Sequence, residues 1–414
     1  MSGPTLISHG CRLNIAESER IAAMLEDEHD LVVVNSCAVT AEAVKTARQA
    51  IRRAKRDQPA ARIVVTGCAA ETEPETFRAM AEVSAIVPNA QKLDASLYPS
   101  SQRKLVSISG QPSLASRDGR PPSPARRESH ARTFLPVQNG CDHRCTFCII
   151  PYGRGPSRSL PAGGVIEEIR AAVDRGAKEV VLTGVDLTAY GADLPGQPSL
   201  GSLVARILKH VPDLPRLRLS SLDPCEVDER LLDLIAHEPR MMPHVHLSLQ
   251  AGDDMILKRM KRRHSRAQAV DLAAKLKALR PDITIGADLI AGFPTEDEAM
   301  FANTLGLIDD CVIALAHIFP YSPRAGTPAA RMPQVARDVI KDRAARLRAA
   351  AARAKAAWLQ EQVGQVTDVL VELDGTSGHA ANFARVTFAA MAPNSIRRVR
   401  ITEVDGDSLV GVAA

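Results

Sequence analysis

Short apolar runs of strand length alternate with helical stretches over the first 100 residues of this chain. Such β-α-β alternation predicts an α/β fold built on a parallel, doubly wound sheet. The predicted strands are residues 5–8, 31–35 and 62–66, and the predicted helices are residues 15–26, 41–55 and about 73–81.

The same alternation returns in a second region, residues 133–362, where six strand-like runs are separated by helices. This pattern predicts a partial (β/α)6 barrel, because a full barrel of eight units needs more chain. A long helix rich in Ala and Arg, residues 338–362, closes the region. The predicted barrel strands are residues 134–138, 179–183, 216–220, 245–249, 284–290 and 314–319.

Two further segments have a different character. Residues 101–132 lack apolar periodicity and carry seven Lys or Arg against Asp118 and Glu128, which predicts a basic linker. Residues 363–414 show period-2 runs at 366–373, 383–388 and 399–404. These runs predict a small antiparallel β-barrel. The expected domains are therefore residues 1–100, 133–362 and 363–414, with the linker after the first.

The cysteine count and the hydropathy of the sequence indicate where the protein is located and what its cysteines do. No apolar run is long enough to span a bilayer, and the N-terminus lacks the basic and apolar segments of a secretory signal. We therefore expect a cytoplasmic protein without membrane contact. Eight cysteines among 414 residues are too few for a disulfide framework, so clustered cysteines indicate metal or catalytic sites.

The motif Cys141-x-x-x-Cys145-x-x-Cys148 follows the first predicted barrel strand. Three thiolates supply three of the four ligands of a [4Fe–4S] cluster and leave one iron open. Loops at the carboxyl ends of barrel strands are where such folds place their chemistry. A structural zinc site is the alternative, but His143 is awkwardly spaced to complete one, and plain buried thiols are the other alternative.

A second set of cysteines, Cys11, Cys37 and Cys68, is scattered in sequence, yet each cysteine follows one predicted strand of the first sheet. The carboxyl ends of parallel strands meet at one edge, where open α/β sheets bind ligands. We therefore expect these thiols to converge on a second cluster, with three unrelated buried cysteines as the alternative. Cys225 and Cys311 lie outside both sets, and we expect them to be structural.

These cysteine motifs closely resemble those of the radical SAM (S-adenosylmethionine) methylthiotransferase family. The resemblance covers essentially the whole chain, and residues 138–159 carry it most clearly. It implies that a [4Fe–4S] cluster on Cys141, Cys145 and Cys148 binds SAM and releases a 5′-deoxyadenosyl radical after reduction. It also implies an auxiliary [4Fe–4S] cluster on the first domain, where sulfur is attached and methylated. The SAM contacts that it implies are Gly184, Asp186, Ser220 and Gln250.

The family divides by substrate, and several segments most resemble its threonylcarbamoyladenosine branch, including residues 67–77, 256–264 and 319–328. The resemblance then implies 2-methylthiolation of threonylcarbamoyladenosine in the anticodon stem-loop of tRNA. It further implies an electron donor such as flavodoxin or ferredoxin, and a sulfur donor. Alternatives within the family are isopentenyladenosine in tRNA and an aspartate of a ribosomal protein.

Local charge supports RNA in places. Residues 258–266 hold six Lys or Arg and, with the linker and the Arg-rich helix, could follow phosphates. The terminal segment resembles an RNA-binding TRAM domain, yet residues 365–414 carry four Arg against six acidic residues. RNA binding by this segment would depend on Arg397, Arg398 and Arg400. Its only candidates for stacking on bases are Phe383 and Phe388.

A different class of protein is also open to this sequence, namely a non-catalytic iron–sulfur module for RNA binding or electron transfer. Electron carriers normally hold each cluster with four ligands. Each set here stops at three cysteines, which this alternative leaves unexplained.

Overall fold

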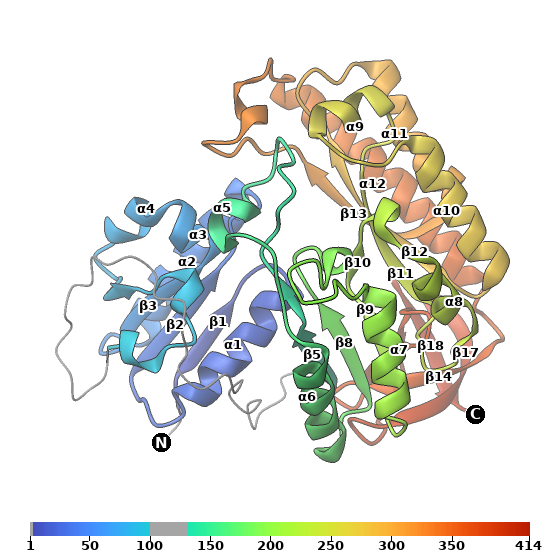
Figure 1. Cartoon of the computed structure of the whole chain (residues 1–414), viewed down its shortest axis with the longest axis horizontal. Helices are drawn as coiled ribbons and strands as arrows, with labels where there is room; N and C mark the ends of the chain where they lie inside the picture. Colours follow the sequence, from blue (N-terminus) through green and yellow to red (C-terminus); the bar gives the residue numbers. More distant parts are fainter. Residues whose placement is uncertain (1–2, 100–130) are drawn as a thin grey trace.

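The computed structural model describes residues 3–99 and 131–414. The predicted basic linker, residues 101–132, therefore lies almost entirely outside the described residues. In Figure 1 the N-terminal sheet is blue, the central strands run from green to orange, and the terminal barrel is red.

The N-terminal part is a four-stranded parallel sheet in the order β1-β2-β3-β4. Helix α1 covers one face with Ile21 and Leu25, and α2 covers the opposite face with Val44, Ala47 and Ile51. Helices on both faces are what the doubly wound prediction requires. The elements are β1 (Thr5–Ser8), α1 (Arg12–Met24), β2 (Leu31–Ser36), α2 (Ala41–Asp57), β3 (Arg62–Gly67), α3 (Cys68–Thr72), α4 (Pro74–Arg78), β4 (Ala85–Ile86) and the short 3-10 turns η1 (Asn89–Gln91) and η2 (Ala95–Leu97).

The central part contains the six predicted strands, arranged as two adjoining parallel sheets, β5-β8-β9 and β10-β11-β12-β13. The third predicted strand is split at Ser220 into β9 and β10. The strands are β5 (Arg132–Pro136), β8 (Glu179–Thr183), β9 (Leu217–Leu219), β10 (Ser221–Leu222), β11 (His244–Gln250), β12 (Thr284–Ala291) and β13 (Ile313–Pro320), with the small β6 (Gln138–Asn139) and β7 (Arg158–Ser159) pair above them.

Helices cover the outer side of these strands and bury the largest apolar core of the chain. Alternate strand residues such as Val245, Leu247, Ile285 and Ala287 enter this core. Their neighbours in sequence face the inside of the partial barrel, because successive strand residues point to opposite faces. The helices and short turns are α5 (Ile150–Arg154), α6 (Ala162–Asp174), η3 (Leu187–Ala189), α7 (Leu200–His210), η4 (Pro224–Glu226), α8 (Glu229–His237), α9 (Asp254–Met260), α10 (Arg266–Leu279), α11 (Glu298–Asp310), η5 (Pro328–Arg331) and α12 (Arg337–Gln360).

The terminal part is a closed five-stranded barrel in the order β14-β15-β16-β18-β17. It is not wholly antiparallel as expected, since β16 and β18 pair in parallel. The sequence pattern also missed two of its strands, because the short, glycine-containing β15 and the terminal β18 carry too few alternating residues. The strands are β14 (Val366–Val371), β15 (Ser377–Ala380), β16 (Arg385–Thr387), β17 (Ile396–Asp405) and β18 (Ser408–Ala413).

Neither aromatic ring proposed for base stacking is free on the surface of this barrel. Phe388 belongs to its apolar core. Phe383 lies instead among three guanidinium groups and the rings of His244 and His379, whose centroids are 4.7 and 4.9 Å from its own. Phe388 is therefore excluded as a base-stacking candidate by its burial, and the ring of Phe383 already packs against other side chains of this chain.

The helix predicted near residues 73–81 is present but shorter, since α4 covers Pro74–Arg78. The preceding α3 was not predicted, and the chain bends at Glu73 between the two helices. A proline fits the first turn of a helix but not its interior. Among the described helices, none is both long and apolar enough to cross a membrane.

A buried charge network joins the central sheet to the terminal barrel. Glu179 accepts two hydrogen bonds from Arg218, at 2.7 and 3.2 Å. Arg218 also donates to the carbonyl oxygen of Ala381 at 3.2 Å, and Arg216 donates to that of Asp368 at 2.9 Å. Burial alone would raise the pKa of Glu179, but Arg218 outweighs it and the pKa is lowered, so the carboxylate is ionised.

Removing this buried carboxylate should destabilise the protein strongly. Glu179→Gln leaves Arg218 charged and uncompensated, which typically costs about 3–5 kcal/mol in the free energy of unfolding. The matched control is Glu229→Gln, which removes an exposed pair with Lys275 at 3.1 Å and should cost less than about 1 kcal/mol. Urea unfolding followed by circular dichroism compares the two, and equal midpoints would show that the buried pair does not stabilise this junction.

Candidate functional site

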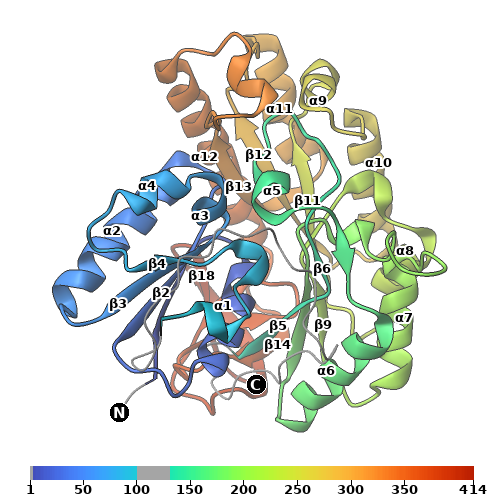
Figure 2. The ribbon, with the colours of Figure 1, turned by 60° about the vertical axis from the view of Figure 1, so that its left-hand side comes forward.

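The first cysteine set lies on a loop between β6 and α5, at the carboxyl end of β5. Figures 1 and 2 show α5 beside α3 of the N-terminal part. Thr146 holds the loop in place through hydrogen bonds of its N–H, its hydroxyl and its carbonyl oxygen. Its N–H and hydroxyl donate to the carbonyl oxygens of Met260 and Arg259, at 3.0 and 2.8 Å, and its carbonyl accepts from Ala329 at 2.9 Å.

The entry to this loop requires glycine at position 140. Gly140 has a φ of +74°, and a Cβ there would lie 1.9 Å from the carbonyl oxygen of Pro156. The next residue, Cys141, donates its N–H to Gly155 at 3.1 Å. Because the two backbones are in close contact, the position of Cys141 is set by main-chain packing.

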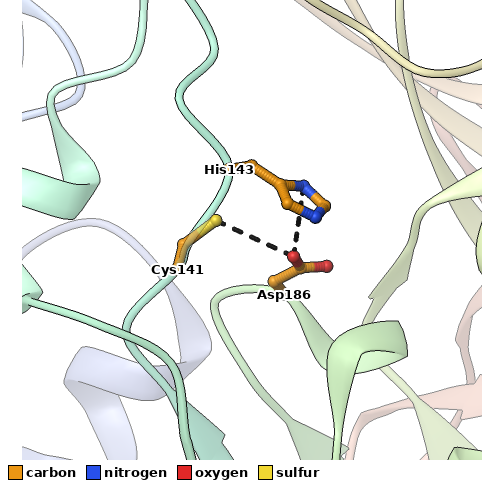
Figure 3. Close-up of side chains that lie close together, drawn as sticks. All are labelled: Cys141, His143 and Asp186. Carbon is orange, nitrogen blue, oxygen red and sulfur yellow. Dashed lines mark hydrogen bonds and ion pairs between the residues drawn. The ribbon is translucent and has the colours of Figure 1, made fainter. Parts of the chain in front are cut away.

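Cys141, His143 and Asp186 meet at the turn after β8, as Figure 3 shows. One oxygen of Asp186 lies 3.7 Å from the sulfur of Cys141 and 3.3 Å from Nδ1 of His143. These three residues could hold a metal ion by themselves. His143 thus approaches Asp186 instead of completing a site with the other two cysteines, so the geometry does not assemble the zinc site weighed from the sequence.

Arg262 contacts the second cysteine of the loop. Its Nη1 lies 3.7 Å from the sulfur of Cys145, and its Nη2 donates to Asp223 and to the carbonyl oxygen of Ser248, at 2.8 and 2.7 Å. The neighbouring Arg263 pairs with Glu226 at 2.7 Å. The sequence placed both arginines in a run for binding phosphates, and no spacing rule could have indicated that this run folds over the cysteine loop.

The thiols of this loop fit a metal cluster by their chemistry. Burial, reinforced by Asp186, raises the pKa of Cys141 to about 12, and burial raises that of Cys148 to about 12. Such thiols stay protonated at neutral pH unless a cation replaces the proton, and metal binding deprotonates coordinating thiols outright. The donor set is therefore suited to iron and not to a free reactive thiolate.

The four residues expected to contact SAM all lie at carboxyl ends of barrel strands. Gly184 and Asp186 follow β8, Ser220 separates β9 from β10, and Gln250 ends β11. The hydroxyl of Ser220 is buried and has no hydrogen-bond partner among the described residues. Gln250 adopts a left-handed φ of +70°, which is strained for a residue with a side chain. Their contacts with SAM remain a prediction.

The second cysteine set lies at one edge of the N-terminal parallel sheet, and its convergence on a cluster stays a prediction. Cys11, Cys37 and Cys68 follow β1, β2 and β3, whose carboxyl ends lie in register. A Cβ on Gly10 would lie 2.8 Å from the sulfur of Cys37, so the segment before Cys11 packs on that side chain. Burial raises the pKa of Cys37 to about 11, with the two other cysteines adding to the rise.

A buried charge network supports this set, and the sequence analysis missed it. Arg154 donates to both oxygens of Glu17 at 2.9 and 3.0 Å, and Lys92 donates to Glu17 at 2.5 Å. The amide of Asn89 lies 3.9 Å from the sulfur of Cys68. Burial would raise the pKa of Glu17, but Lys92 and Arg154 lower it to about 2. One net positive charge therefore remains beside the cysteines.

The two cysteine sets face each other across α5. This helix begins two residues after Cys148 and packs on α3, which begins at Cys68. A Cβ on Gly153 would lie 3.2 Å from the Cβ of Cys68. The remaining cysteines are elsewhere, with Cys225 exposed near Asp223 and Cys311 buried in the main apolar core.

Known proteins match this arrangement over nearly the whole chain. The Radical SAM superfamily matches residues 135–308, and the family described as "Uncharacterized protein family UPF0004" matches residues 5–88. The threonylcarbamoyladenosine tRNA methylthiotransferase MtaB of Rickettsia prowazekii (strain Madrid E) is 46% identical, over 92% of this chain and 90% of the relative. The tRNA-2-methylthio-N(6)-dimethylallyladenosine synthase of Erythrobacter litoralis (strain HTCC2594) is 36% identical, over 89% and 86%.

A solved structure supports the fold alone. The cobalamin-dependent S-adenosylmethionine radical enzyme OxsB, with aqua-cobalamin and S-adenosylmethionine bound, has a TM-score of 0.50 and 12% identity, over 84% of this chain and 55% of that chain. The sequence relatives carry the assignment, because they cover 92% and 89% of this chain at 46% and 36% identity. The chain belongs to the radical SAM methylthiotransferase family and is an enzyme that uses a [4Fe–4S] cluster and SAM.

Proposed function

We propose that this enzyme converts N6-threonylcarbamoyladenosine in the anticodon stem-loop of tRNA to its 2-methylthio derivative. The observation that carries the proposal is the pair of three-cysteine sets that face each other across α5. The substrate is favoured by identity, which is 46% to a relative named for threonylcarbamoyladenosine and 36% to one named for dimethylallyladenosine.

In this proposal each cysteine set holds one [4Fe–4S] cluster with an open iron. Cys141, Cys145 and Cys148 hold the cluster that binds SAM, with Gly184, Asp186, Ser220 and Gln250 around the cofactor. Cys11, Cys37 and Cys68 hold the auxiliary cluster that carries the sulfur. Together the bound groups supply a 5′-deoxyadenosyl radical at one site and a methylthio group at the other.

The chain's own residues position these groups. Arg262 ties the cysteine loop to β11 through the carbonyl oxygen of Ser248, and it places a positive charge beside Cys145. Arg154 and Lys92 keep positive charge beside Cys68. Burial raises the pKa of Cys68, and Arg154 and Lys92 offset part of that rise, because an opposite charge nearby stabilises a thiolate.

The proposed partners follow from the same reaction. The substrate is tRNA, and the exposed Arg397, Arg398 and Arg400 of β17 are candidate phosphate contacts. Electrons come from a donor such as flavodoxin or ferredoxin, and the sulfur comes from a separate donor. We place the reaction in the cytoplasm, where tRNA and these donors meet.

Loss of the gene should remove 2-methylthio-N6-threonylcarbamoyladenosine from tRNA and leave its unmethylthiolated precursor in its place. Mass spectrometry of nucleosides from the deletion strain measures both, and the wild-type gene on a plasmid should restore the product. Loss of a 2-methylthio isopentenyl nucleoside instead would assign the other tRNA branch. Unchanged nucleosides with a mass shift in a ribosomal protein would assign the third substrate.

Substitution of a single cysteine in either set should halve the iron content of the reconstituted protein. Anaerobically reconstituted wild type should hold about eight irons per chain, as two cubes require. Cys11→Ala should hold about four and still cleave SAM, whereas Cys145→Ala should hold about four and lose SAM cleavage. Cys225→Ser is the control, because Cys225 is exposed and outside both sets. Full iron in Cys11→Ala, or no SAM cleavage by the wild type, would contradict the assignment.

A further inference from the structure

A cavity of about 140 Å³ lies on the inner side of the partial barrel, between β11, β13, α12 and the terminal barrel. An engineered cavity of about 150 Å³ accepts benzene, so this one has room for a substituent of several heavy atoms. Its lining is unusually rich in basic side chains and histidines. The lining residues are Arg12, His244, His246, Leu315, His317, Lys355, Trp358, Leu359, Phe383, Ala384, Arg385 and Asp407.

Most of the charges around this cavity are already paired. Lys355 lies 3.1 Å from Asp407. His246 and His317 share one oxygen of Asp288, at 2.9 and 3.2 Å. These contacts leave Arg12 and Arg385 without an ion pair among the residues that the structure describes.

Of these two arginines, Arg12 gives the stronger evidence for a bound anion. Three guanidinium groups, those of Arg12, Arg132 and Arg218, surround the ring of Phe383 at 5.3, 5.3 and 4.8 Å. Arg132 has Glu372 at 2.9 Å and Arg218 has Glu179 at 2.7 Å. Among the described residues Arg12 has no carboxylate within ion-pair distance, and Glu179 and Asp288 act on it only from farther away. A guanidinium removed from water beside two others is costly unless an anion joins it.

A metal ion is the less suitable occupant. Ligand atoms of His246, Asp288 and His317 lie within 4.8 Å of one another and could hold one. However, the unpaired cations Arg12 and Arg385 line the same cavity and would repel it. The lack of a carboxylate within ion-pair distance of Arg12 therefore favours an oxyanion beside that residue.

The cavity is connected in the chain to both proposed cluster sites. Arg12 directly follows Cys11 of the auxiliary set. His246 precedes Ser248 and Gln250 on the same face of β11, because alternate strand residues share a face. The cavity therefore lies on the face of β11 that carries Ser248 and Gln250, nearer to the amino end of the strand.

We infer that this cavity binds the carboxylate of the threonylcarbamoyl substituent, with Arg12 as its main partner and Arg385 and His317 at its edge. The inference rests on the proposed function and names the residues that distinguish an acidic adenine substituent from an apolar one. A dimethylallyl group would leave Arg12 unpaired, and so it gains nothing from the cavity.

Binding of three anticodon stem-loop RNAs to anaerobically reconstituted enzyme tests this inference. The RNAs carry threonylcarbamoyladenosine, its methyl ester, or plain adenosine, and fluorescence anisotropy gives each Kd. The wild type should bind the acid about 10–100-fold more tightly than the ester, as a charge-assisted hydrogen bond predicts. Arg12→Gln should abolish this ratio, and Arg12→Lys should restore part of it.

Two further variants check the result expected for Arg12→Gln. Arg53→Gln removes an exposed positive charge on α2 and should leave the acid-to-ester ratio unchanged. Arg385 is far in the sequence from every cysteine. Arg385→Gln should lower the acid-to-ester ratio about 3–10-fold, because its contact at the edge of the cavity is weaker than that of Arg12. If Arg12→Gln fails to retain its iron, Arg385→Gln alone decides, and an unchanged ratio there overturns the inference.

Other outcomes are equally specific. Equal loss of affinity for acid and ester in Arg12→Gln would mean that the anion is an RNA phosphate, and the inference would fail. A wild type that methylthiolates threonylcarbamoyladenosine but does not distinguish acid from ester would sustain the function and overturn the inference. A wild type that methylthiolates only isopentenyladenosine would overturn the function itself.

Discussion

The placement of the two cysteine sets depends on the buried contact between Arg154 and Glu17. Arg154 follows Cys148 by six residues, and Glu17 follows Cys11 by six residues. Their contact therefore joins the segment that leaves one set to the helix that leaves the other. Because these groups are charged and nearly inaccessible to water, loss of Glu17 would leave Arg154 and Lys92 buried without the carboxylate that they share. The N-terminal sheet is thereby held against the barrel close to both cysteine sets.

The sequence predicted the strands and the meeting of the cysteines for one physical reason. Parallel strands buried on both faces appear as continuous apolar runs, and their carboxyl ends must share an edge. Cys11, Cys37 and Cys68 could therefore be brought together without any spacing rule. The barrel strands were predictable in the same way, apart from the break at Ser220, which no periodicity marks.

The contacts that complete the site lie beyond such reasoning. Arg154 and Glu17 are 137 residues apart, and Arg262 and Cys145 are 117 apart. Pairing between side chains so distant in sequence depends on how whole domains pack. Local patterns in the sequence therefore cannot predict it. Phe383 is a similar case, since an aromatic ring in a small barrel suggests stacking on a base. Only the packing shows that three arginines already surround it.

The position of Phe383 bears on how proteins of this kind diversify. The terminal barrel supplies Phe383, Ala384 and Arg385 to the cavity inside the partial barrel, and so it is not a detachable handle for RNA. A chimera that exchanged this barrel between relatives would therefore exchange part of the wall of this cavity as well.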